Sequence, residues 1–132
     1  MRILAVDFGT KHTGLALGVD KTTTPLTSIT TTKTDYLVRE IIKVVGEEHI
    51  KLIVVGNPLN KDIKQSKLTK KFVENLKKNT ECKIKLVDEY NSSKESFSQN
   101  FEKHSKIKKL KQKEHSLAAE QILKNYYLGS NN

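Results

Sequence analysis

Asp7 stands at the end of an apolar run, where the chain reaches a glycine-containing turn. Residues 3–6 are apolar at every position, which predicts a strand that is buried on both faces. β-compatible residues resume at Thr13, after Gly9. A carboxylate there is costly to bury unless a cation, hydrogen-bond donors or a capping role compensates its charge. Two interpretations are open: a metal-binding carboxylate, and a turn-capping Asp, because Asp near Gly is common in turns.

Two later apolar runs also end in polar residues. Gly56 and Asn57 follow the run 52–55, and the pair Asp88-Glu89 follows the alternating segment 83–87. In open α/β sheets, ligands bind in the crevice at the strand ends. Carboxylates at such ends suit hard divalent cations. Two Mg²⁺ or Mn²⁺ ions about 3.5–4 Å apart could support hydrolysis of a phosphodiester. They could neutralise the charge of the phosphate, activate the attacking water and stabilise the leaving oxygen.

The pattern predicts an α/β fold in which a five-stranded mixed sheet is flanked by helices. A helix starts at Thr34 or Asp35, and Ser66 can cap a second one. A weaker short helix is marked by Phe97 and Phe101. We expect one domain over residues 1–128 and a frayed tail over 129–132. The expected strands are 2–7, 13–19, 25–31 (an edge strand containing Pro25), 51–55 and 83–87; segment 103–113 is a loop or a mobile basic helix, and the last helix spans about 114–128.

Several motifs together resemble one known family over nearly the whole chain. The most specific are Asp7-x-Gly9-x-Lys11-x-x-Gly14-x-Ala16 and Gly56-x-Pro58-Leu59-Asn60, and Asp88-Glu89 and the Ala118-Ala119 helix support them by position. They resemble the YqgF family of RNase H-like pre-16S rRNA nucleases, also described as Holliday junction resolvases. The resemblance implies an RNase H-like fold and a metal-dependent nuclease that trims the 5′ end of pre-16S rRNA. Branched DNA is the alternative substrate.

The resemblance also implies the catalytic metal ligands. Asp7 is the candidate bridging ligand, Glu89 the second, and Asp88 a supporting residue, although the adjacency of Asp88 and Glu89 leaves their assignment open. The third position departs from the family, because His115 stands where an Asp is usual and Glu114 lies beside it. At about 3.6 residues per turn, His115 shares a face with Ala118, Ala119, Ile122 and Tyr126, whereas Glu114 points roughly 100° away. His115 is the better candidate, although it could instead cap or pack the helix start.

Two more departures concern phosphate binding. The family commonly has Arg after Asp-Glu, but Tyr90 follows here, and Lys94 is the candidate substitute. In the family a Gly usually follows the motif that ends at Asn60, whereas in this chain the motif is followed by Lys61.

The net charge of +9 comes entirely from residues 61–113, which hold sixteen Lys against seven acidic residues. A nucleic acid is the natural partner of such a segment, although a solvated lysine-rich loop is the alternative.

The lone Cys82 cannot form an internal disulfide and alternates with Ile84 and Leu86 as a small core residue would. With no membrane span in the sequence, we expect a reduced, cytoplasmic compartment. The nucleic-acid-binding candidates are Lys11, His12, Asn57, Lys94, Lys106, Lys108, Lys109, Lys111 and Lys113.

Two other function classes are consistent with parts of the sequence. The segment Asp7 to Thr10 is similar to the first phosphate loop of the actin and hexokinase superfamily, but that fold needs two such domains and 132 residues supply one. No Walker-type phosphate loop is present either. The other class is a non-catalytic ribosome- or RNA-binding factor. Such a protein would keep the fold but would have lost its metal affinity because His115 replaces an Asp. Divalent-ion binding separates this factor from a nuclease.

Overall fold

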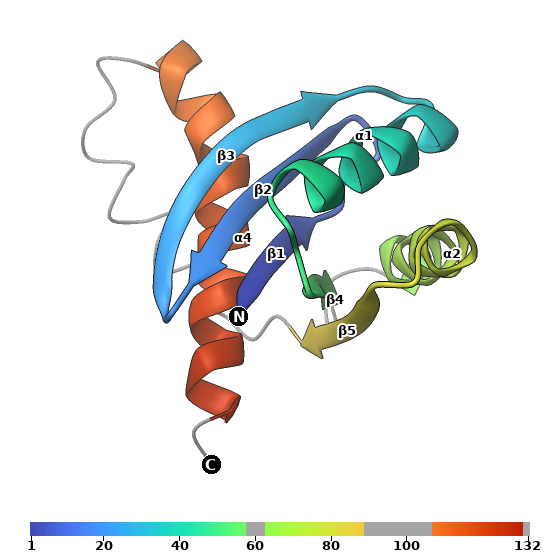
Figure 1. Ribbon diagram of the computed structural model, residues 1–132. Coiled ribbons are helices and arrows are strands. Elements are labelled where there is room, and N and C mark those ends of the chain that lie inside the picture. The colour runs from blue at the N-terminus through green and yellow to red at the C-terminus, as the bar shows by residue number, and fades with distance from the viewer. Residues whose placement is uncertain (58–62, 89–106, 131–132) are drawn as a thin grey trace.

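The computed structural model describes residues 1–57, 63–88 and 107–130, and within these ranges the side chains of Asp88, of residues 107–116 and of Ser130 are not described. Figure 1 shows one sheet with helices on both faces. The predicted α/β fold with a five-stranded mixed sheet is confirmed. In the described residues no helix is long and apolar enough to cross a membrane.

The sheet has the strand order β3-β2-β1-β4-β5. The strands are β1 (Arg2–Asp7), β2 (His12–Val19), β3 (Thr22–Thr30), β4 (Leu52–Asn57) and β5 (Lys83–Asp88). Strands β1, β2 and β3 form an antiparallel meander, and β4 and β5 continue the sheet in parallel with β1. The predicted edge strand is confirmed as β3, although it begins three residues before the expected Pro25. Pro25 is tolerated because, among the described strands, β3 pairs with β2 alone.

The two faces of the sheet carry separate cores. Helices α1 (Thr34–Glu47) and α2 (Ile63–Asn79) cover one face, and α4 (Ile107–Ser130) crosses the other (Figure 1). Side chains alternate along β1, so that Leu4 and Val6 pack with α1 and α2, whereas Ile3 and Ala5 pack with α4. A strand with a core on each side must be apolar at every position. The uninterrupted apolar runs of β1 and β4 therefore agree with the central positions of these strands in the sheet.

The C-terminal half of α4 confirms the predicted packing face and corrects the helix boundaries. Ala119 and Ile122 are buried against the sheet, as expected, and so is Leu123. However, α4 begins at Ile107, not near residue 114, and continues to Ser130. Of the two alternatives for segment 103–113, a loop or a basic helix, the structure shows a helix for residues 107–113, whereas residues 103–106 lie outside the described residues. The expected short helix around Phe97 and Phe101 lies outside the described residues.

The start of α2 also differs from the prediction. Ser66 was expected to cap this helix, but α2 begins three residues earlier, at Ile63. The Ser66 hydroxyl instead donates to Asn57 Oδ1 at 3.2 Å, which links α2 to the end of β4. A serine inside a helix can use its hydroxyl for such a tertiary contact, and the local sequence cannot distinguish this role from capping.

Cys82 lies against the core, as predicted. It is partly buried beside Ile84, and its thiol contacts the Ile50 carbonyl oxygen at 3.7 Å. Burial raises the pKa of the Cys82 thiol, which disfavours the reactive thiolate.

Candidate active site at the carboxyl ends of the parallel strands

The carboxyl ends of the three parallel strands bring Asp7, Asn57 and Asp88 to one edge of the sheet. Asn57 pairs with Asp88 across β4 and β5, and Val6, which precedes Asp7, pairs with Val55 of β4. The sheet thus places at one edge residues that are far apart in the chain. Glu89, the predicted second ligand, directly follows β5 and lies outside the described residues.

Asp7 occupies the face of the sheet that α4 covers. Strand alternation decides this, because Ile3 and Ala5 both belong to the core beneath α4. Across the antiparallel pair, Asp7 is opposite Gly14, and Gly56 follows the β4 partner of Val6. The strand positions directly beside Asp7 are therefore glycines, which add no side chain on this face. That arrangement leaves room for a cation beside the carboxylate.

The same alternation can be followed along β5. Ile84 packs on the α1 and α2 side of the sheet, whereas Val87 packs on the α4 side. The Asp88 position therefore falls on the face opposite to Asp7. Because the Asp88 side chain and Glu89 are not described, the roles of both residues stay predictions.

The turn between β1 and β2 depends on Gly9. A Cβ at Gly9 would collide with the backbone carbonyl oxygen of His12. The Thr13 hydroxyl closes the turn, because it lies 3.4 Å from both the amide nitrogen and the carbonyl oxygen of Gly9. Gly9 therefore allows the tight return of the chain directly after Asp7.

Replacing Gly9 with Ala tests this turn. Because the clash is with backbone, we expect the variant to lose about 1–3 kcal/mol of unfolding free energy. Thermal unfolding followed by circular dichroism measures the loss. Gly46→Ala in α1 is the matched control, since a Cβ there would meet no atom of the described residues within 4 Å. Removing a helical glycine should stabilise by about 0.5–1 kcal/mol. A Gly9→Ala protein that melts at or above the wild-type temperature would contradict the role of this turn.

Helix α2 supports the Asp7 turn from the other face. Phe8 stacks on Phe72 with ring centroids 4.5 Å apart, and Gln65 Nε2 donates to the Phe8 carbonyl oxygen at 3.4 Å. Together with the Ser66 to Asn57 bond, these contacts fix the first turns of α2 to the ends of β1 and β4. Sequence reasoning missed Gln65, because its partner is a backbone atom 57 residues away.

The candidate phosphate ligands have different surroundings. Lys11 is exposed in the turn, and His12 Nδ1 lies 3.2 Å from the Thr30 hydroxyl on β3. Asn57 is only 7% exposed and is bonded to Ser66, so it joins β4 to α2. Its predicted contact with nucleic acid stays a prediction. Lys94 and Lys106 lie outside the described residues, and the side chains of Lys108, Lys109, Lys111 and Lys113 are not described.

His115, the predicted third ligand, lies in α4, the helix that covers the Asp7 face. It is four residues before Ala119 and seven before Ile122, both of which are buried against the sheet, so its backbone belongs to the same side of the helix. Within the described residues, no three His, Cys, Asp or Glu side chains form a metal-binding group. Glu89 and the His115 side chain lie outside that part of the chain, so the ligand set stays a prediction.

Residues 1–128 match the family model described as "RuvX: Holliday junction resolvase". The chain belongs to this family. A protein named "Putative pre-16S rRNA nuclease" from Buchnera aphidicola subsp. Baizongia pistaciae is 35% identical over 137 residues, covering 100% of both chains. RuvX membership makes the chain a nuclease, a hydrolase of phosphodiester bonds with a nucleic acid substrate, and implies dependence on a divalent metal.

Solved structures share the fold of this RuvX protein. The fowlpox virus Holliday junction resolvase has a TM-score of 0.58 and 17% identity, with 100% of both chains covered. RuvC of Thermus thermophilus, in complex with a Holliday junction substrate, has a TM-score of 0.53 and 11% identity over 67% of this chain and 64% of that one. At these identities the likeness establishes the RNase H-like fold alone.

Proposed function

We propose that this RuvX protein is a metal-dependent nuclease that acts on structured RNA and matures the 5′ end of pre-16S rRNA. The position of Asp7 carries the proposal. Asp7 ends a central strand and lies within the most specific motif. The neighbouring positions on β2 and β4 are the glycines Gly14 and Gly56. The name of the full-length Buchnera relative supports rRNA as the substrate. Residues 1–128 would form the nuclease as one domain, with the ribosome as a further partner.

The residues fit one or two Mg²⁺ or Mn²⁺ ions. Asp7 and Glu89 would supply the hard carboxylate oxygens that these ions prefer, and His115 would supply an imidazole nitrogen. Glu89 is proposed over Asp88 because the resemblance to the family assigns the second ligand to this position. When bound, the ions neutralise charge on the phosphate and lower the pKa of water.

The protein's own groups would bind and orient the substrate. Gly9 and the Gln65 contact to Phe8 hold Asp7 at its strand end. Lys11 in the adjoining turn, His12 at the start of β2, and Lys94 would contact a phosphate next to the scissile one. The basic residues Lys106, Lys108, Lys109, Lys111 and Lys113 would attract the nucleic acid backbone without reading its sequence.

Branched DNA is the second candidate substrate. The description of the matching family favours it, and so does the shared fold with a RuvC structure that holds a Holliday junction. In that case the protein would cut a four-way junction instead of trimming RNA. The two substrates need the same phosphodiester chemistry, so the metal ligands would not change.

A cleavage assay on both substrates decides between these functions. Wild-type protein is incubated with a pre-16S rRNA 5′ fragment or a four-way DNA junction, in Mg²⁺, in Mn²⁺ and in EDTA. We expect metal-dependent cleavage of the RNA and an intact junction. A cut junction beside intact RNA would assign a resolvase instead. Tight binding of RNA with no cleavage in either metal would indicate a binding factor.

A further inference from the structure

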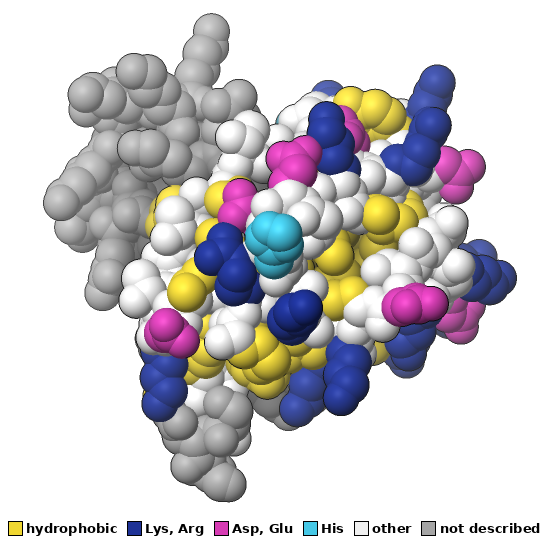
Figure 2. Space-filling model, viewed as in Figure 1, with side chains coloured by type: hydrophobic (Ala, Val, Ile, Leu, Met, Phe, Trp, Pro, Cys, Tyr) yellow, Lys and Arg dark blue, Asp and Glu magenta, His cyan; other side chains and the backbone are white. Residues whose placement is uncertain are grey.

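The outward face of α2 carries a concentration of positive charge that lies outside the candidate site. Residues 63–79 contain six Lys and one acidic residue, Glu74. The apolar side of the helix is buried through Phe72, Val73 and Leu76. Figure 2 shows blue side chains along the right and lower side of this view, over α2 and β5. The exposed lysines are Lys64, Lys67, Lys70, Lys71, Lys77 and Lys78.

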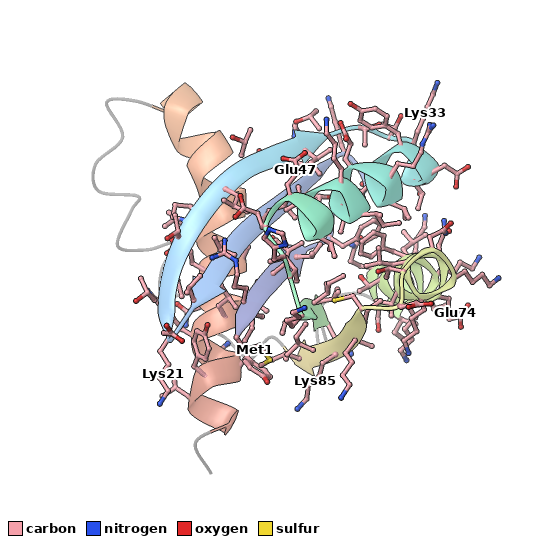
Figure 3. The ribbon with its side chains drawn as sticks, viewed as in Figure 1. Met1, Lys21, Lys33, Glu47, Glu74 and Lys85 are labelled. Carbon is pink, nitrogen blue, oxygen red and sulfur yellow. The ribbon has the colours of Figure 1, made fainter. Side chains whose placement is uncertain are left out.

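Four of these lysines form a ridge along the helix. With about 100° between successive residues, Lys64, Lys67, Lys71 and Lys78 fall within a stripe of about 60°. The stripe is about 21 Å long at 1.5 Å per residue. Lys67, Lys71 and Lys78 form no ion pair with the described part of the chain. Glu74 projects outward from the same helix (Figure 3), and its one charge cannot balance the ridge.

Helix α1, on the same face of the sheet, does not share this excess. Both helices cover the same face of the sheet, and both are amphipathic. However, residues 34–47 carry two basic residues, Arg39 and Lys43, against three acidic ones. A lysine-rich composition alone would raise the charge of both helices.

The ridge begins at the same edge of the sheet as Asp7. Gln65 is bonded to the Phe8 carbonyl and Ser66 to Asn57, so the first turns of α2 are fixed beside the ends of β1 and β4. The helix then returns the chain toward the other end of the sheet, because the parallel strand β5 starts at Lys83, which pairs with Leu52 at the start of β4. A nucleic acid strand lying on the ridge would therefore lead to the site of cleavage.

We propose that the α2 ridge (Lys64, Lys67, Lys71 and Lys78) is a second nucleic-acid-binding surface, which holds the sugar-phosphate backbone of the substrate beyond the cleavage site. The proposal rests on the proposed nuclease function. Lysine ammonium groups act as point charges toward phosphate and lack the bidentate geometry with which arginine reads guanine. The exposed side of α2 carries no aromatic residue on which a base could stack, because Phe72 is buried. The ridge should therefore bind without sequence preference.

The salt dependence of binding tests the ridge. We expect Lys67→Gln/Lys71→Gln/Lys78→Gln to bind a fluorescein-labelled RNA hairpin more weakly in metal-free buffer. Its plot of log K against log salt should be flatter by about 2–3, because each phosphate that a lysine no longer neutralises reduces the slope by about 0.7–0.9. Fluorescence anisotropy measures both quantities. Glu74→Gln should have the opposite effect and tighten binding at low salt.

The matched control removes the same charge elsewhere. Lys33, Lys43 and Lys124 are also exposed and lie outside α2, so Lys33→Gln/Lys43→Gln/Lys124→Gln should keep the wild-type salt slope. An unchanged slope in the α2 variant would overturn the proposal, and so would equal flattening in the control, which would show that only net charge matters. Metal-free binding keeps this result separate from catalysis. If Asp7→Asn still cleaves RNA, the metal site fails while the ridge result stands.

Discussion

Replacing Asp7 with Asn is expected to abolish cleavage while leaving the fold intact. The substitution is nearly isosteric, but it removes the negative charge that a divalent ion requires. A metal ion contributes several kcal/mol of transition-state stabilisation, so its loss should lower the cleavage rate by about two to three orders of magnitude or more. The cleavage assay measures the rate, and isothermal titration with Mn²⁺ should show weakened metal binding in the same variant.

Asp20→Asn is the matched control for Asp7→Asn. Asp20 is an exposed aspartate in the turn between β2 and β3, at the other end of β2 from the Asp7 turn. Its φ of 50° lies in the left-handed region, which Asn also tolerates. The control should cleave at the wild-type rate. Full activity in a folded, homogeneous preparation of Asp7→Asn would remove the proposed mechanism.

The second large effect is expected at His115, where the chain departs from its family. His115→Asp should restore a site made only of carboxylates, and the added negative charge favours a hard ion. We therefore expect cleavage in Mg²⁺ to rise relative to cleavage in Mn²⁺. His115→Ala should lower the rate in both metals. The ratio of the two rates is the measurement, because a general loss of stability would lower both rates equally.

Glu114→Ala is the control for His115, since it changes the neighbouring side chain in the same turn of α4. If the face defined by Ala119 and Ile122 extends back to His115, the Glu114 variant should change the rate little. An inactive Glu114→Ala beside a fully active His115→Ala would show that Glu114 is the ligand.

Acid pH provides a separate signature of a histidine ligand. Imidazole binds a metal only when it is neutral, so protons compete with the ion as the pH falls. Wild-type cleavage should decline below about pH 6.5, where free imidazole becomes protonated. His115→Asp should remain active at lower pH. Identical pH profiles for the two proteins would argue against a histidine in the metal site.

The central strands and the place of Asp7 were predictable because they follow from local composition. Residues 3–6 and 52–55 are apolar without interruption, and only a strand covered on both faces requires that pattern. The buried stripe of α4 was predictable for a similar reason, since Ala119 and Ile122 repeat at helical spacing. Asp7 was predictable as a candidate because a carboxylate at the end of such a strand needs compensation.

Tertiary structure decided the features that depend on partners distant in the chain. Ser66 has the right residue type for a helix cap, but packing against β4 gives its hydroxyl a different partner, Asn57. The charge excess is visible in the sequence, where residues 103–113 are its densest part. Only the fold shows that the lysines of α2 share one exposed side of a helix fixed beside Asp7. Local composition sets which segments must be buried, whereas the packing of distant segments sets which polar groups meet.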